Sequence, residues 1–158
     1  MPYNTRYVYT AYEVLTAANL NNNDENLDYL KSKADRKTWS VRAFSPSQTI
    51  VTGDGAAYFP VPADLNGMDL VAVGSVCYTV SSSGVVQVQI HNLTSAVDVL
   101  STRLEIDASE YSSYTAATPA VINTANDNFT SGDRWRIDVD AAGTGAKGLD
   151  IIFSALLS

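Results

Sequence analysis

The chain is short of the residues on which disulfide, metal and nucleophile chemistry depends. Its 158 residues include one cysteine, Cys77, and one histidine, His91. One cysteine excludes an intramolecular disulfide and a cysteine-cluster metal site, and its apolar neighbours favour a small buried side chain. No nucleophile-elbow motif accompanies His91, so we interpret it as a surface or subunit-interface residue rather than a catalytic one. We expect no enzyme, no metal site and no cofactor.

Long apolar runs and an excess of positive charge are absent as well. No stretch approaches the roughly 18 apolar residues that can span a bilayer, and the first ten residues lack the apolar centre of a signal peptide. The net charge is −7, whereas nucleic-acid binders carry a basic patch. We therefore expect a soluble protein made in the cytoplasm, with neither nucleic acid nor a membrane as partner.

What the sequence does contain is a series of strand patterns, clearest near its end. Polar and apolar residues alternate over residues 134–141 and again over 149–155, which is the period of a strand with one buried face. Residues 142–148 between them include three glycines. This pattern predicts an antiparallel hairpin that closes the sheet. Trp135, Ile137 and Val139 are expected in the core.

Shorter strand patterns fill the rest of residues 38–158. Turns rich in Gly, Pro, Ser and Asn separate them. We predict strands over residues 39–44, 49–52, 57–61, 69–80, 85–92, 101–107 and 120–123. The run over 69–80 is apolar on both faces, which indicates a central strand covered on both sides. Eight or nine short strands favour a mainly β fold, an antiparallel, jelly-roll-like β-sandwich.

Two parts of this pattern resemble a known group of proteins. The run GDRWRIDVDAAGTGAKGLDIIF (residues 132–153) and the preceding segment 99–133 resemble the C-terminal β-domain of tailed-bacteriophage virion proteins, chiefly head and tail fibres. The run LTAANLNNNDENLDYL (residues 15–30) resembles the helix near the start of phage fibre proteins. The resemblance implies a non-enzymatic fibre, spike or decoration protein of the virion, made in the host cytoplasm. It implies capsid, neck or tail proteins as partners, and it carries no active-site residue.

Residues 1–37 form the N-terminal part, with a helix expected over 13–37. Leu20, Leu27 and Ala34 fall at one heptad position, and Asn23 and Leu30 at the complementary one. Such a short helix is marginal alone in water, so it needs a partner. It can pack onto the β-domain or self-associate, and the resemblance favours a homotrimer. The basic residues near its end complement the helix dipole or contact an acidic partner; they are Lys31, Lys33, Arg36 and Lys37.

An arm of twelve residues precedes the helix and is rich in tyrosine. Four of the nine tyrosines lie there: Tyr3, Tyr7, Tyr9 and Tyr12. Tyrosine is enriched at protein interfaces because its ring supplies contact area and its hydroxyl bonds at the rim. We interpret the arm as the virion attachment segment, or as an arm ordered on its own trimer.

Three further groups of side chains have alternative interpretations. Tyr111 and Tyr114 are candidate contacts for a host-surface glycan, or loop residues that pack on a neighbouring subunit. Glu105, Asp107 and Glu110 could suggest a glycosidase pair but equally form a solvated strand face. Asp133, Asp138 and Asp140 could suggest calcium, yet Arg134 and Arg136 share their strand, so ion pairing is the preferred interpretation.

Overall fold

The computed structural model describes residues 24–28, 30 and 35–157. The chain divides into two compact units, Met1–Arg36 and Lys37–Ser158. In the first unit, residues 24–28 and Leu30 have helical backbone. The other residues assigned to the helix before residue 35 lie outside the described residues, as do all of the arm and Lys31 and Lys33.

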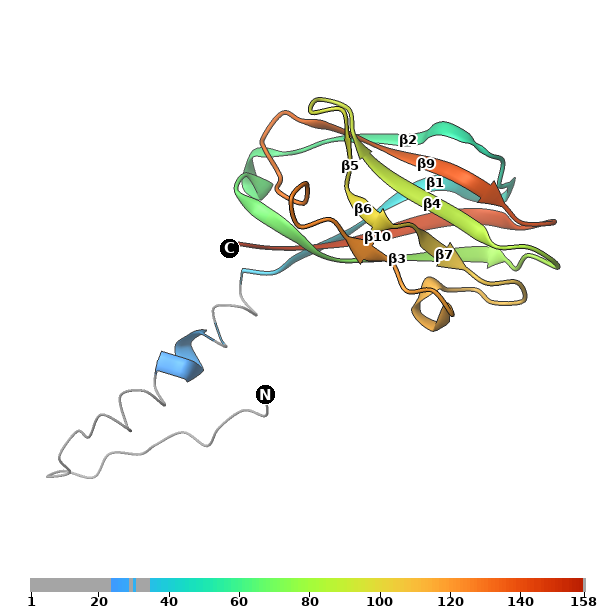
Figure 1. The fold of residues 1–158 in the computed structure, drawn as a ribbon, viewed down its shortest axis with the longest axis horizontal. Helices are drawn as coiled ribbons and strands as arrows, with labels where there is room; N and C mark the ends of the chain where they lie inside the picture. The colour runs from blue at the N-terminus through green and yellow to red at the C-terminus, as the bar shows by residue number, and fades with distance from the viewer. Residues whose placement is uncertain (1–23, 29, 31–34, 158) are drawn as a thin grey trace, which may run out of the picture. The chain divides into compact units, whose positions relative to one another are not determined.

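The second unit is mainly β, and its sheets are antiparallel (Figure 1). The first sheet has the order β1 (Lys37–Thr49), β10 (Lys147–Leu157), β3 (Met68–Thr79). The second has the order β2 (Gly53–Pro60), β9 (Arg134–Ala142), β4 (Val86–Asn92), β5 (Val97–Asp98), with β7 (Leu104–Ile106) also paired to β4. A small sheet pairs β6 (Leu100–Thr102) with β8 (Val121–Ile122), and two 3₁₀ turns are present, η1 (Ala63–Leu65) and η2 (Ser113–Thr115).

The strand pairing is nested from the outside of the sequence inward. The first strand, β1, pairs with the last, β10, and the second, β2, pairs with the penultimate, β9. The next two strands fill the opposite sides of these partners, since β3 pairs with β10 and β4 with β9. The C-terminal pair therefore forms the centre of both sheets, while strands from the first half of the chain flank it.

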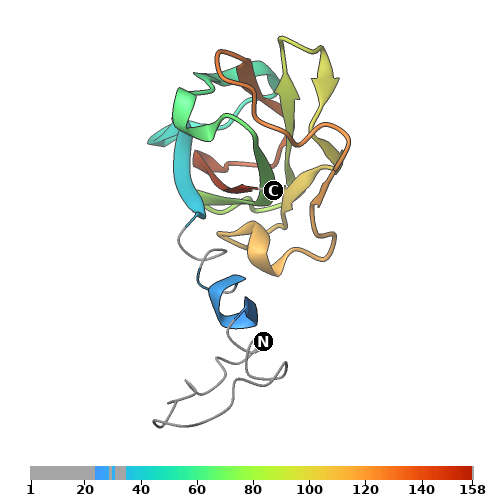
Figure 2. The same cartoon turned by 90° about the vertical axis from the view of Figure 1, so that its left-hand side faces the viewer.

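The two sheets share one apolar core, in a sandwich-like arrangement that Figure 2 shows from the side. The rings of Trp39 and Phe153, both in the first sheet, stack with centroids 5.4 Å apart. The ring of Phe59, in the second sheet, lies 5.1 Å from that of Phe153. Phe129 stacks on Trp135 at 4.3 Å. Burial of Trp135, Ile137 and Val139 is confirmed, and that of Cys77 as well.

The predicted hairpin between the last two strands is wrong. β9 lies in the second sheet and β10 in the first, so the connection between them crosses from one sheet to the other. Both strands have one apolar face, and both faces pack into the same core. β9 covers this core from one sheet, and β10 covers it from the other. The glycine-rich turn is held against the turn from β3 to β4, which crosses likewise. The Thr144 amide donates to the Ser83 carbonyl at 2.9 Å, and the Ser82 amide donates to the Thr144 carbonyl at 2.9 Å.

Three strand assignments also need correction. Residues 50–52 form no strand, because β1 continues to Thr49 and buried Ile50 then bonds through its amide to the Ala146 carbonyl. The strand predicted over 101–107 is split between β6 and β7, and β5 was not predicted. β3 is an edge strand rather than a central one. Its free edge is covered by a loop, where the Cys77 amide donates to the Tyr111 carbonyl at 2.8 Å.

Candidate functional site

The outer face of the first sheet presents exposed tyrosine rings over glycine. Because Ile151 and Phe153 point into the core, Asp150 and Ser154 point outward. We call this surface the tyrosine face. It consists of Thr38, Ser40, Arg42, Gly74, Val76, Tyr78, Tyr114, Gly148, Asp150, Ile152 and Ser154.

Tyr114 lies directly on the backbone of β3. A Cβ atom at Gly74 would stand 2.6 Å from Cζ and Oη of Tyr114, so only glycine leaves room for the ring. The ring nevertheless remains open to solvent, since Tyr114 is 68% exposed. Its loop is anchored by the Ser75 amide, which donates to the Ser113 hydroxyl at 2.8 Å. The position of the Tyr114 ring over Gly74 is therefore set by the sheet beneath it and by this anchor.

Tyr78 repeats this arrangement on the same face, over Gly148. A Cβ atom there would lie 2.7 Å from Cδ2 of Tyr78. The Tyr78 hydroxyl donates to Asp150 Oδ2 at 2.8 Å, and Arg42 donates to both carboxylate oxygens, at 2.8 and 3.0 Å. The Arg42 guanidinium, by these hydrogen bonds, holds the pKa of Asp150 below its ordinary value of 3.8. This bidentate pair fixes the polar end of Tyr78.

The two rings are spaced and equipped for a ligand with several units. The Tyr78 ring lies over Gly148, which is opposite Tyr78 on β10. The Tyr114 ring lies over Gly74, four residues from Tyr78 along β3. The two ring positions are therefore roughly 13 Å apart. Hydroxyl groups line the neighbouring strands, where Thr38 and Ser154 lie 2.9 Å apart. Flat apolar rings beside hydroxyl and charged groups suit a hydroxylated ring ligand.

Of the two predicted glycan contacts, Tyr114 belongs to this face and Tyr111 lies near it. Tyr111 is 61% exposed, and its carbonyl group covers the free edge of β3. Tyr78 was missed by the sequence reasoning, because its strand was expected to be covered on both sides. The glycines at 74 and 148 were the available signal, since a glycine inside a strand often marks the close approach of another group.

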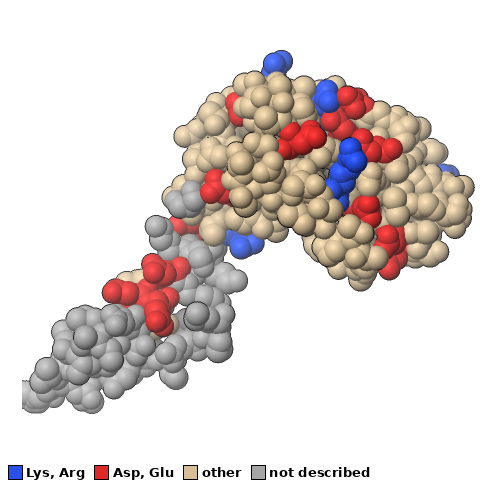
Figure 3. Space-filling view, viewed as in Figure 1, with Lys and Arg blue, Asp and Glu red and all other residues tan. Residues whose placement is uncertain are grey.

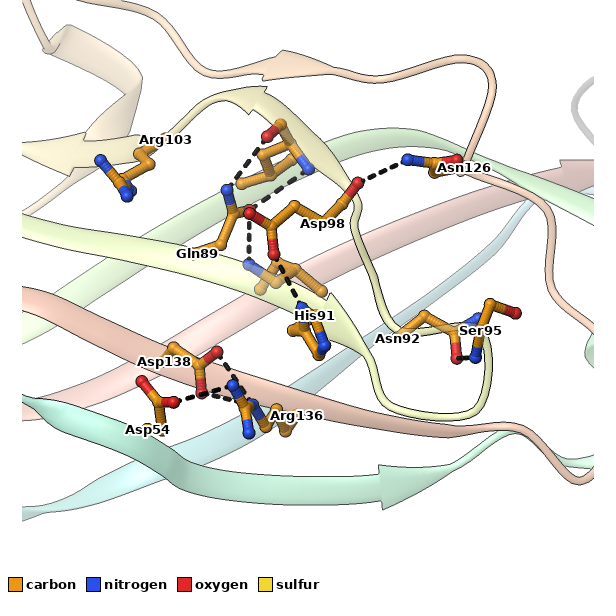
Figure 4. Close-up of polar contacts among 12 residues, drawn as sticks. Asp54, Gln89, His91, Asn92, Ser95, Asp98, Arg103, Asn126, Arg136 and Asp138 are labelled. Carbon is orange, nitrogen blue, oxygen red and sulfur yellow. Dashed lines mark hydrogen bonds and ion pairs between the residues drawn. The ribbon is translucent and has the colours of Figure 1, made fainter.

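A second polar cluster lies on the outer face of the other sheet, where charges of both signs gather (Figures 3 and 4). Arg136 donates to Asp138 and to Asp54, each at 2.9 Å. Asp138 also accepts the Gly55 amide at 2.8 Å, and Asp140 pairs with Arg103 at 2.7 Å. The expected ion pairing with Arg136 is confirmed for Asp138, whereas Asp140 pairs with Arg103 instead. For Asp133 the expectation is wrong, because it makes no ion pair with any described residue.

His91 belongs to the same cluster and is engaged by a carboxylate. Its Nδ1 lies 2.7 Å from Asp98 Oδ1, and the ring is half-buried beside Arg136 on β9. Within the described part of the chain, the side-chain hydrogen bonds of His91 involve no serine or cysteine. The pair therefore orients the imidazole.

The sequence left open a glycosidase carboxylate pair among three acidic residues. In the structure, each of these carboxylates has its own hydrogen-bond partner nearby. Glu105 accepts a hydrogen bond from Gln87 Nε2 at 2.6 Å, and Asp107 accepts the Ala117 amide at 2.8 Å. Glu110 accepts from the Thr115 hydroxyl. Each carboxylate thus stabilises its own strand or loop.

The predicted oligomerisation residues are described only in part. Leu27 and Leu30 are 63% and 49% exposed. Leu20, Asn23 and Ala34 lie outside the described residues, and so do the attachment tyrosines Tyr3, Tyr7, Tyr9 and Tyr12. Among the residues that the structure does describe, no helix has the length and apolar character to cross a membrane.

An apolar cleft opens where the edges of the two sheets, β1 and β2, meet. It has a volume of about 360 Å³ and is lined chiefly by apolar side chains, among them Trp39, Phe59 and Leu65. An ion pair between Lys37 and Asp64, at 3.5 Å, lies at its rim. The cleft offers apolar contact but few groups that could orient a ligand.

Comparisons with protein-family models, with curated proteins and with solved structures give no match to this chain.

Proposed function

We propose that this chain is a non-enzymatic structural protein of a tailed-bacteriophage virion, of the fibre, spike or decoration type. One observation carries the proposal. The run that resembles such proteins, residues 132–153, supplies β9 and most of β10, the strands at the centre of both sheets. The nested strand order supports a jelly roll, since that fold pairs early strands with late ones across two sheets. The protein would be made in the host cytoplasm and reside in the virion.

The N-terminal unit would attach and trimerise the protein. Exposure of Leu27 and Leu30 supports self-association, because apolar side chains at heptad spacing gain by packing against a second helix. In this proposal the seam of Leu20, Asn23, Leu27, Leu30 and Ala34 forms a short coiled coil, and the arm contacts capsid, neck or tail proteins. The second unit would project outward.

The test is to locate the protein on particles. Antibodies raised against residues 37–158 are applied to purified virions, and labelled particles are imaged by cryo-electron microscopy. We expect labels at fixed positions on the head, neck or tail. Absence of the protein from washed virions, with the protein present in the lysate, would contradict the proposal.

A second candidate function is glycan binding during host adsorption. The observation that favours it is the tyrosine face, where Tyr78 and Tyr114 lie open to solvent over glycine, next to hydroxyl groups and the Arg42–Asp150 pair. Rings held in place before a ligand arrives lose little conformational freedom on binding. Such a surface is suited to the C–H faces of sugars.

The glycan proposal is tested by comparing the wild-type protein on a glycan array with a variant in which the Tyr114 ring is displaced. Gly74→Ala keeps an ordinary backbone conformation but places a Cβ where the Tyr114 ring lies. We expect Gly74→Ala and Tyr114→Ala each to weaken binding about tenfold, a loss of about 1.4 kcal/mol. Tyr58→Ala is the control, because Tyr58 is 62% exposed on the other sheet. Silence of the wild-type protein on a broad array would end this candidate.

A further inference from the structure

A polar pocket lies where β4 ends and β9 begins. Its volume is about 250 Å³. Asn92 closes β4, Asp133 immediately precedes β9, and the segment 125–130 forms the remaining side. Figure 4 shows Asn92 and Ser95 at the turn after β4, with Asn126 on a separate segment. The polar lining residues are Asn92, Ser95, Asn126, Asn128, Thr130 and Asp133.

Asp133 places a buried carboxylate in this pocket. The residue is 8% exposed, and Asn92 Nδ2 donates to its Oδ2 at 2.9 Å. Within the described ranges, no lysine, arginine or histidine pairs with Asp133, and its Oδ1 accepts no hydrogen bond. A buried charge is costly unless a partner neutralises it. Asp138, which is buried to a similar degree, has that partner in Arg136.

Two other lining residues, Asn126 and Asn128, use an N–H of their amide groups on protein acceptors. Asn126 Nδ2 donates to the Asp98 carbonyl at 2.9 Å, and Asn128 Nδ2 donates to Asp69 Oδ1 at 3.1 Å. Their amide oxygens accept no hydrogen bond from the described residues. The hydroxyls of Ser95 and Thr130 add two further oxygen atoms. The pocket therefore offers several acceptor oxygens that the described residues leave without a hydrogen-bond donor.

Neighbouring carboxylates make this end of the molecule electronegative. Asp69 accepts a hydrogen bond from Asn128 Nδ2 at 3.1 Å, and Asp127 lies between Asn126 and Asn128 in the sequence. A cation would find a favourable potential here, because clefts lined by one sign of charge concentrate the opposite ion.

We propose that this pocket binds a calcium ion. Calcium takes six to eight oxygen ligands from carboxylates, amide carbonyls, hydroxyls and water. The pocket supplies the carboxylate of Asp133, the amide oxygens of Asn126 and Asn128, and the hydroxyls of Ser95 and Thr130, with room for water. Magnesium suits the pocket less, because it demands a compact octahedron. A single carboxylate implies a dissociation constant on the order of 10⁻⁴–10⁻³ M.

This site differs from the calcium alternative drawn from the sequence. That alternative combined Asp133 with Asp138 and Asp140. In the structure, Asp138 and Asp140 form ion pairs with arginines instead. Asn92 holds Asp133 in place: its own amide oxygen accepts the Thr94 and Ser95 amides at 2.9 and 3.2 Å. The site joins β4, β9 and the 125–130 segment, so calcium would brace one end of the sandwich-like unit.

The experiment titrates the full-length protein with calcium chloride by isothermal titration calorimetry, and follows its thermal unfolding. We expect saturable binding in the stated range and a rise of about 4 °C in Tm at tenfold excess over the dissociation constant. Magnesium chloride at equal concentration should bind at least tenfold more weakly. Asp133→Asn, which keeps the size of the side chain, should abolish both responses. Asp64→Asn, at an exposed carboxylate outside this pocket, should leave both unchanged.

A gain-of-function variant keeps the test decisive if Asp133→Asn fails to fold. Ser95→Asp adds a second carboxylate to the exposed rim and should tighten calcium binding about tenfold. No saturable binding by the wild-type protein at ~10 mM calcium, far above the expected constant, would overturn the proposal. So would unchanged affinity in a folded Asp133→Asn or in Ser95→Asp. Binding of neutral sugars without calcium, abolished by Asp133→Asn, would assign the pocket to a hydroxylated ligand instead.

Discussion

Trp135 combines complete burial with an unmet hydrogen bond. Its ring is fully buried against Phe129 and Phe59, yet its Nε1–H has no partner among the described residues. The packing stabilises the fold, whereas a buried donor without an acceptor costs about 1–3 kcal/mol. The two effects can be separated by substitution.

We predict that Trp135→Ala lowers the free energy of unfolding by about 3–5 kcal/mol, because it leaves a large cavity. Trp135→Phe should cost less than about 2 kcal/mol, since it keeps most of the contacts and removes the unmet donor. Urea denaturation of both variants measures the difference. An equal loss in the two variants would contradict the prediction, because phenylalanine would then recover none of the lost packing.

The Asp150 carboxylate makes part of the stability dependent on pH. Hydrogen bonds from Arg42 hold its pKa below 3.8, the ordinary value it regains on unfolding. A folded pKa below the unfolded one stabilises the protein above pH 3.8, and this contribution is lost as the pH falls through the folded value. We predict that Asp150→Asn is less stable than wild type at neutral pH and that the difference shrinks below pH 3.8. Denaturation curves across this range check it, and a pH-independent difference would contradict it.

At the scale of elements, the local pattern predicted which faces are buried but not how the strands pair. The inward faces of β9 and β10 follow from alternation of residues two apart, and Trp135 and Phe153 lie where that alternation places them. Pairing depends on the path of the connection. A run with three glycines allows a hairpin or a crossing, and only contacts with the distant 81–84 turn decide between them.

The glycines of that connection offer a matched pair of variants. Gly145 and Gly148 both have positive φ, 75° and 63°, where an L side chain costs about 1–2 kcal/mol. A Cβ at Gly145 meets nothing within 4 Å, whereas at Gly148 it meets the Pro46 backbone at 2.7 Å. We predict that Gly148→Ala destabilises the fold clearly more than Gly145→Ala. Thermal unfolding of the two variants tests this, and equal Tm values would show that the backbone near Pro46 yields.

The helical seam carries a prediction about assembly. Leu27 is 63% exposed, so a polar substitution costs nothing within that helix itself. In a coiled-coil seam, however, Leu27→Asp would bury an unpaired charge, which a short seam cannot tolerate. We predict that the variant is monomeric while the β-unit stays folded, as light scattering and circular dichroism would report. A variant that still scatters as a trimer would contradict the seam.

At the scale of the whole molecule, both candidate sites join residues far apart in the sequence. Tyr78 meets Arg42 and Asp150 across 36 and 72 residues, and Asn92 meets Asp133 across 41. The sequence identified Tyr114 and Asp133 as residues of interest, since residue type alone suggests them. It could not assemble either site, because each depends on the nested pairing that brings both ends of the chain to the centre.

The division of the chain into two units gives a prediction for the arm, residues 1–12. The chain divides into two units, and residues 1–12 belong by sequence to the first, Met1–Arg36. If the arm attaches the protein to the virion, its tyrosines act at an interface and contribute nothing to the core. Deleting residues 1–12 should therefore leave Tm within about 2 °C of wild type, less than a change of ~1 kcal/mol would cause, and abolish incorporation into particles. Normal incorporation would place attachment on the helix, and a folding defect would show that the arm belongs to the β-unit.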